Sequence, residues 1–181
     1  MTANENSSAR MRLADDHQVL DALLKSLTVT LDAGDPAKIF NELDLFWARL
    51  AMHIRAENTR LFPALLAAAN YDLGVQTDPL KVREAIAKLR EDHNFFMTQL
   101  AEAVQLARRL AEDNQPNHRE SLDQIRCMVA TVQALLETHN VLEEEFVYGL
   151  QVKLLSVAEQ EELADGIRRE LEKFPGRFSH A

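Results

Sequence analysis

A histidine and a glutamate interrupt the apolar stripe of the last long helical segment, and this interruption constrains the fold more than any other feature. The stripe positions recur every three or four residues: Leu122, Ile125, Val129, Val132, Leu136, His139, Glu143, Phe146 and Leu150. Such spacing places side chains on one face of an α-helix, toward the core. Because an unpaired buried carboxylate costs several kcal/mol, Glu143 predicts a cation beside it, one helical turn from His139.

Four long helices are expected, with short loops between them, over residues 9–33, 36–70, 79–112 and 119–155. The apolar stripe of the first carries His17, that of the second carries His53 and Glu57, and that of the third carries His93. His53 and Glu57 repeat the H-x-x-x-E spacing of the fourth helix, which allows both side chains to reach one ion. Pro63 predicts a kink or a change of direction in the second helix.

The stripe histidines are equally far from the turns that join their helices. The point halfway between His17 and His53 is position 35. The corresponding points are position 73 for His53 and His93, and position 116 for His93 and His139. All three fall in expected loops, and short turns between antiparallel helices bring such residues to one level. The sequence therefore predicts an all-α protein, an antiparallel up-down-up-down four-helix bundle with four histidines in one core layer.

A short C-terminal fifth helix is also expected. The sequence from Ser156 to Glu159 has the pattern of a capping box, which starts a helix, and this helix extends to about Lys173. The chain then divides into a flexible N-terminus (1–8), a four-helix bundle (9–155) and a C-terminal helix with its tail (156–181).

The six polar stripe residues suit two metal ions better than one. Four imidazoles and two carboxylates exceed the ligands of one tetrahedral zinc, so we expect two ions, each held by two histidines, with the glutamates bridging. Imidazole suits iron, copper, nickel and zinc, and carboxylate shifts the choice toward iron or manganese. Helical bundles that project Glu and His inward hold di-iron and di-manganese sites. The open positions on two irons suit an oxo or hydroxo bridge, or a diatomic ligand such as dioxygen or nitric oxide.

In this doubled arrangement the sequence resembles the haemerythrin-like HHE cation-binding family over about residues 15–150. The resemblance implies a four-helix bundle around a non-haem di-iron centre with these metal ligands: His17, His53, Glu57, His93, His139 and Glu143. The chain differs from oxygen-carrying haemerythrins, which have a further histidine at the position of Met97 and an aspartate at that of Glu143. It is more similar to di-iron proteins associated with repair of iron–sulfur clusters under nitrosative stress. Those proteins carry N-terminal cysteines, whereas the only cysteine here is Cys127.

Polar residues beside the stripes are assigned to the surface. Asp16 and Asp92 each precede a stripe histidine, but adjacent helix positions point about 100° apart. We therefore expect both to be solvated rather than to orient the histidines. Glu144 and Glu145 are expected to be solvated as well, with Glu144 as an alternative ligand if the helix rotates slightly. Tyr148 lies off the stripe.

Charge and composition exclude several classes of partner. The net charge of −9 argues against nucleic acid and against an anionic membrane. Charges interrupt every apolar run, so no transmembrane helix is expected, and residues 1–12 lack the apolar core of a signal peptide. A single cysteine excludes an internal disulfide, and the cytoplasm is the expected location.

Three functions remain open for such a site. We favour a protein that binds or senses dioxygen, nitric oxide or iron, because the open metal positions come with no evident substrate pocket. The alternative is a di-iron enzyme or an iron donor in defence against oxidative or nitrosative stress, working with a redox or protein partner. A third function is structural: the ions stabilise the bundle, and its surface binds a protein. Manganese or zinc in place of iron is compatible with each function.

Overall fold

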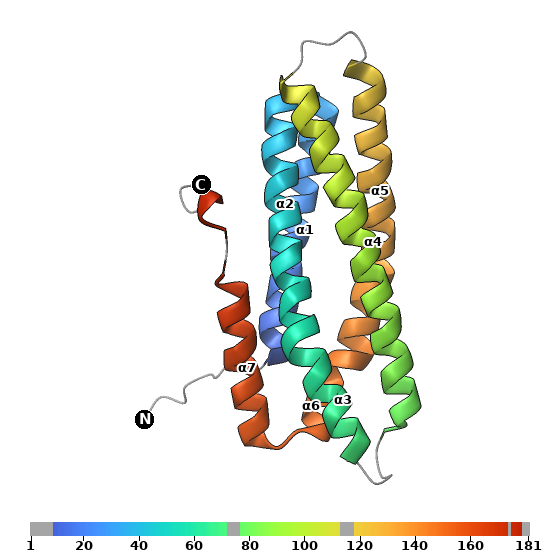
Figure 1. The fold of residues 1–181 in the computed structure, drawn as a ribbon, viewed down its shortest axis with the longest axis vertical. Helices are drawn as coiled ribbons and strands as arrows, with labels where there is room; N and C mark the ends of the chain where they lie inside the picture. The colour runs from blue at the N-terminus through green and yellow to red at the C-terminus, as the bar shows by residue number, and fades with distance from the viewer. Residues whose placement is uncertain (1–8, 72–76, 113–117, 174, 179–181) are drawn as a thin grey trace.

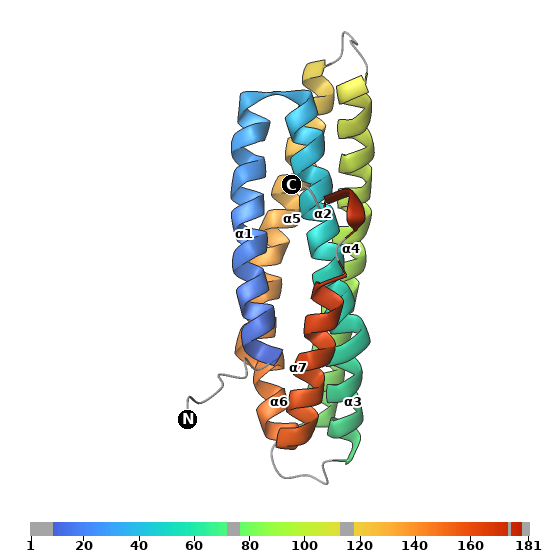
Figure 2. The same cartoon turned by 90° about the vertical axis from the view of Figure 1, so that its left-hand side faces the viewer.

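Four long helices form the body of the molecule. The computed structural model describes residues 9–71, 77–112, 118–173 and 175–178, and over these ranges it contains helices and no strand. The long helices lie side by side (Figures 1 and 2): α1 (Ala9–Ala33), α2 (Pro36–Ala56), α4 (Pro79–Glu112) and α5 (His118–Leu142). Successive helices run in opposite directions, with α1 packed on α2, α2 on α4 and α4 on α5. The predicted all-α antiparallel bundle is confirmed. None of the described helices is long and apolar enough to cross a membrane.

Two of the long helices continue through a short π-helical segment. α2 passes through η1 (Glu57–Leu61) into α3 (Phe62–Tyr71), and α5 passes through η2 (Glu143–Val147) into α6 (Tyr148–Leu154). In each segment a backbone N–H donates to the carbonyl five residues earlier, from Phe62 to Glu57 and from Tyr148 to Glu143. These π-turns each begin at a stripe glutamate, and the sequence pattern does not predict them. Pro63, where a kink is predicted, is the second residue of α3.

The helix ends follow from local sequence signals. The first and third predicted helices coincide with α1 and α4. Gly34 adopts φ 76°, a conformation that favours glycine and ends α1. The Asp35 side chain then accepts hydrogen bonds from the backbone N–H groups of Ala37 and Lys38, with Pro36 at the first helical position of α2. The predicted flexible N-terminus (1–8) and the centres of two predicted loops (72–76 and 113–117) lie outside the described residues.

Two apolar clusters fill the bundle, one on each side of the histidine level. The first contains Leu27, Leu43 and Phe96 among others, and the second contains Leu13 and Leu65 among others. Along each long helix the stripe histidine lies between residues of the two clusters. Burial of this apolar surface, at about 25 cal/mol per Å², stabilises the helices that carry the polar layer. The polar layer is therefore packed between apolar side chains on both sides.

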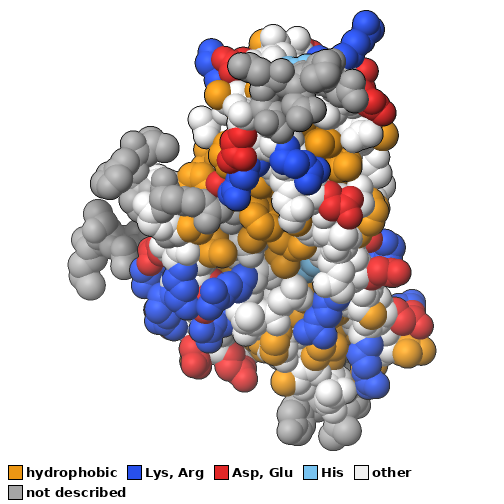
Figure 3. Space-filling model, turned by 45° about the horizontal axis from the view of Figure 1, so that its top comes forward, with side chains coloured by type: hydrophobic (Ala, Val, Ile, Leu, Met, Phe, Trp, Pro, Cys, Tyr) orange, Lys and Arg blue, Asp and Glu red, His pale blue; other side chains and the backbone are white. Residues whose placement is uncertain are grey.

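The fifth helix, α7 (Val157–Leu171), starts at the predicted capping box, in which Ser156 and Glu159 exchange hydrogen bonds. It packs against α1 and α2. Its Glu170 is buried and accepts hydrogen bonds from Arg60 of the bundle and from Lys173. Figure 3 shows Lys and Arg side chains gathered at the lower left, where α7 lies. Hydrogen bonds from Arg60 and Lys173 lower the pKa of Glu170 to about 2.

Substitution of Glu170 with glutamine is expected to loosen α7. Because the pKa of Glu170 falls from 4.5 to about 2 on folding, its stabilising effect is present above pH 4.5 and is lost as the pH falls toward 2. Since its cationic partners are half exposed, we expect a loss of about 1–2 kcal/mol at pH 7. Urea denaturation at pH 7 measures it. Glu172→Gln, which alters an exposed carboxylate paired with Arg168, is the control, and an equal loss there would contradict the assignment.

Candidate metal centre

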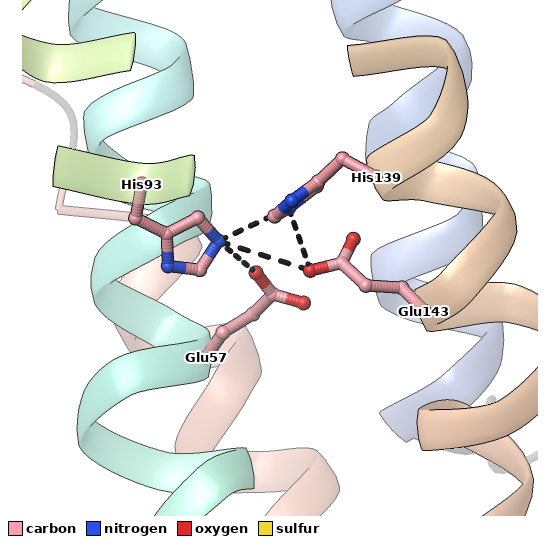
Figure 4. Close-up of side chains that lie close together, drawn as sticks. All are labelled: Glu57, His93, His139 and Glu143. Carbon is pink, nitrogen blue, oxygen red and sulfur yellow. Dashed lines mark hydrogen bonds and ion pairs between the residues drawn. The ribbon is translucent and has the colours of Figure 1, made fainter. Parts of the chain in front are cut away.

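The structure brings all six predicted site residues together in the core. Each long helix contributes one histidine, and the two glutamates are the first residues of the π-helical segments η1 and η2. All six side chains are buried: His17, His53, Glu57, His93, His139 and Glu143. The Nε2 atoms pair across the bundle, at 3.1 Å between His17 and His53 and at 3.2 Å between His93 and His139. Figure 4 shows His93, His139 and both glutamates pointing toward one another.

Glu143 faces both histidine pairs at once. Its Oε1 lies 2.9 Å from His139 Nε2 and 3.8 Å from His93 Nε2, while its Oε2 lies 3.2 Å from His17 Nε2. Glu57 also lies between the pairs, because its Oε2 is 3.3 Å from His93 Nε2 and 3.6 Å from His53 Nε2. Both carboxylates therefore lie between the two histidine pairs.

Two histidines contact aspartates through Nδ1, the ring nitrogen that points away from the centre of the site. We call the residues at these Nδ1 atoms the outer partners of the histidines. His53 Nδ1 lies 3.0 Å from Asp16 Oδ2, and His139 Nδ1 lies 3.4 Å from Asp92 Oδ2. The expectation that both aspartates are solvated is wrong, since both are buried. Each reaches across the bundle to the histidine of a neighbouring helix rather than to the one beside it in sequence. A carboxylate at Nδ1 fixes the ring and leaves Nε2 for a cation.

The other two histidines have outer partners from the residues that follow the glutamates. His17 Nδ1 lies 2.7 Å from Glu144 Oε1, and His93 Nδ1 lies 3.2 Å from Asn58 Nδ2. Asn58 Oδ1 is buried without a hydrogen bond among the described residues, and a half-turn of the amide brings this acceptor to His93. Glu144 is exposed, as expected, but it contacts a site histidine from outside instead of standing in for Glu143.

Tyr148 belongs to the site, contrary to its predicted place off the stripe. Its side chain is fully buried, and its hydroxyl donates to Glu57 Oε1 at 2.8 Å. The same oxygen lies 3.2 Å from Glu143 Oε2 and 3.2 Å from His17 Nε2. Burial and the charges of the two glutamates raise the pKa of Tyr148 well above its usual value.

The carboxylates control the protonation of the histidines when no metal is bound. Burial lowers the pKa of His17 and of His93, but nearby carboxylates overcome it and raise both pKa values to about 9. At His17 these are Glu143, the hydrogen-bonded Glu144 and the charge of Glu57, and at His93 they are Glu143 and Glu57. Burial dominates at His53 and lowers its pKa to about 4. Although burial raises the pKa of Glu143, its contacts with His139, His17 and His93 hold it well below 4.5. The site thus attracts cations strongly enough to retain protons above neutral pH.

The donor set fits metal ions. Two groups of potential ligand atoms each lie within 4.8 Å of one another, one from Glu57, His93, His139 and Glu143 and the other from His17, His53 and Glu143. Glu57 Oε2 and Glu143 Oε1 are buried and face histidine nitrogens, at 3.3 Å from His93 Nε2 and 2.9 Å from His139 Nε2 respectively. The ion-pair partners of both carboxylates in the described part of the chain are histidines. The buried negative charges of the two glutamates face side chains that themselves bind metals, so metal cations compensate these charges best.

Loss of an outer carboxylate is expected to weaken metal binding. Asp16→Asn removes the charge behind His53, and such outer partners typically contribute 10–100-fold to metal affinity. We therefore expect a drop of about 10-fold or more, measured by competition with a chelator. Asp15→Asn is the matched control, because Asp15 is exposed and precedes Asp16 directly. Equal affinities in the two variants would show that Asp16 has no influence on the site.

Comparison with known proteins agrees with the geometry. The family model described as "Hemerythrin HHE cation binding domain" matches residues 9–150, which span α1 to α6 and include all six site residues. Searches of curated proteins and of solved structures gave no match. The family implies cation binding, and the His/Glu clusters in the core are able to hold metal ions. The chain therefore belongs to the haemerythrin HHE cation-binding domain family.

Proposed function

We propose that the six core residues hold two iron ions and that this centre binds a small diatomic ligand, dioxygen or nitric oxide. One ion is assigned to His17 and His53, the other to His93 and His139, with Glu57 and Glu143 shared between them. The main support is Glu143, whose two oxygens face opposite histidine pairs. Bound iron would supply redox-active coordination positions for such a ligand.

The surroundings of the site favour a small ligand over a larger substrate. A groove of about 770 Å³ runs between α1 and α5, and His17 and Glu144 are among its lining residues. A second cavity of about 10 Å³ is lined by His17, His53 and His139, among others. That volume is near the minimum for one water molecule. The groove and the small cavity share five lining residues, so they adjoin each other beside the site: His17, Asp21, Leu24, Leu136 and Asn140.

The residues around the six ligands would orient the histidine rings and exclude water from the centre. Asp16, Asp92 and Glu144 hold three of the rings by their Nδ1 atoms, so that each Nε2 faces the centre. The two apolar clusters keep bulk water away from the layer. Exclusion of water strengthens the electrostatic interactions inside the site.

Metal analysis combined with gas titration tests the proposal. We expect about two iron ions per chain, one for each of the two histidine pairs, and a change in the visible spectrum when dioxygen or nitric oxide is added anaerobically to the reduced protein. Iron without any spectral response to either gas would refute ligand binding. The enzymatic alternative requires repeated turnover with a reductant present, and a single stoichiometric reaction would count against it.

A further inference from the structure

The two halves of the site differ at one pair of equivalent positions. Phe62 follows Glu57 by five residues, and Tyr148 follows Glu143 by five residues, each at the end of a π-turn. Phe62 stacks on His93 with ring centroids 5.7 Å apart, and Tyr148 stacks on His17 with centroids also 5.7 Å apart. Both aromatic rings are fully buried. The halves thus have the same architecture, but only the ring beside His17 carries a hydroxyl.

That hydroxyl oxygen lies among atoms of three residues assigned as ligands. It is 2.8 Å from Glu57 Oε1, 3.2 Å from Glu143 Oε2 and 3.2 Å from His17 Nε2. Ligands about 2.1 Å from one ion and at right angles to each other are separated by about 3.0 Å. The three distances match this spacing. The hydroxyl can donate its one proton to one carboxylate and can accept a hydrogen bond from His17, which leaves the contact with the other carboxylate unexplained, whereas a shared cation accounts for all three contacts together.

We propose that the Tyr148 oxygen is a seventh protein ligand, bound to the cation that His17 and His53 hold. This inference rests on the proposed function, since it requires a metal at that position. Coordination as a phenolate breaks the O–H bond and forms one metal–oxygen bond, and the proton leaves to solvent. Phe62 has no such atom, so the ion at His93 and His139 has one protein ligand fewer. The two metal positions are therefore inequivalent.

The experiment uses ferric iron, because phenolate bound to it produces a charge-transfer band in the visible range. Resonance Raman excitation within that band enhances the vibrations of the bound phenolate. The chain has two tyrosines, Tyr71 and Tyr148, so Tyr71→Phe leaves Tyr148 as the only source of the signal. We expect the band and the phenolate vibrations in the unaltered protein and in Tyr71→Phe, and their complete loss in Tyr148→Phe with iron still bound.

The controls separate this proposal from the one on which it rests. Iron content is measured first, and a protein that takes up no iron contradicts the proposed function and the Tyr148 ligand together. An iron-loaded protein without phenolate vibrations contradicts only the Tyr148 ligand. If Tyr148→Phe does not fold, the spectrum of Tyr71→Phe decides the question, because Tyr148 is then the only phenol present. Phe62→Tyr supplies a hydroxyl at the equivalent position and is expected to add a second phenolate signal.

Discussion

Replacement of Glu143 with alanine is expected to abolish stable binding of metal at both proposed positions. Each of its oxygens faces a different histidine pair, Oε1 toward His139 and Oε2 toward His17. Loss of an outer partner already costs 10–100-fold in metal affinity, so loss of a shared ligand is expected to cost at least about 100-fold. Elemental analysis after desalting, with chelator competition for the remaining affinity, measures the effect.

Two further variants make this result specific. Glu57→Ala removes the other shared carboxylate and is expected to lower the metal content in the same way. Glu145→Ala changes an exposed residue of the same π-turn as Glu143 and is expected to keep the full metal content. Circular dichroism verifies that all three variants remain helical. Equal metal content in the three would refute the ligand assignment.

The architecture was predictable because the apolar stripes are long and regular. Stripes in four segments, with Gly34, Asp35 and Pro36 at one boundary, indicate the helices and their ends directly. The antiparallel order then follows from loop length, and the equal distances of the histidines from the turns predict a common layer. These signals depend on period and spacing alone, both of which are visible in a single sequence.

The residues that contact the Nδ1 atoms of the histidines could not be predicted when each helix was considered separately. Asp16 is about 100° from His17 on the same helix, which suggests exposure if each helix has one buried face. In the bundle each helix packs against more than one neighbour, so a second face is buried as well. Asp16 therefore reaches His53 on α2, and Asp92 reaches His139 on α5 in the same manner. The repeated Asp–His pair in the sequence was the available signal.

The prediction that Tyr148 lies away from the site is wrong because the chain between Glu143 and Tyr148 is π-helical rather than α-helical. In a regular α-helix a residue five positions after Glu143 is rotated about 140° from it. The π-turn of η2 closes a hydrogen bond over five residues, which returns Tyr148 to the face of Glu143. The same change of register in η1 brings Phe62 to the ring of His93. Pro63 indicates an irregularity near η1, but no residue type marks η2.

The metal-free protein is expected to lose stability as the pH rises from 6.5 to 9. His17 and His93 have pKa values raised from 6.5 to about 9 in the folded state. The folded chain therefore binds more protons than the unfolded chain in this window, and its free energy of unfolding falls as the pH rises. The stabilisation is complete below pH 6.5, and its loss by pH 9 amounts to several kcal/mol. His53, with its pKa lowered from 6.5 to about 4, is neutral in the folded state across the window. In the unfolded chain it loses its remaining proton just above pH 6.5, which adds only a small opposite change at the start of the window.

Bound metal is expected to abolish this fall in stability with rising pH, so a comparison of the metal-free and metal-loaded proteins tests the site. Metal ions replace the protons on His17 and His93, and affinity for metal increases as fewer protons compete. We expect urea denaturation with a chelator present to show stability falling between pH 6.5 and 9, and the Zn²⁺-loaded protein to show no fall. A Glu57→Gln, Glu143→Gln double variant removes the two buried charges that raise these pKa values and leaves only the exposed Glu144 beside His17, so its metal-free form is expected to lose much less stability over this window. The same loss of stability in the double variant would mean that other groups cause it and that the carboxylates do not hold protons on these histidines.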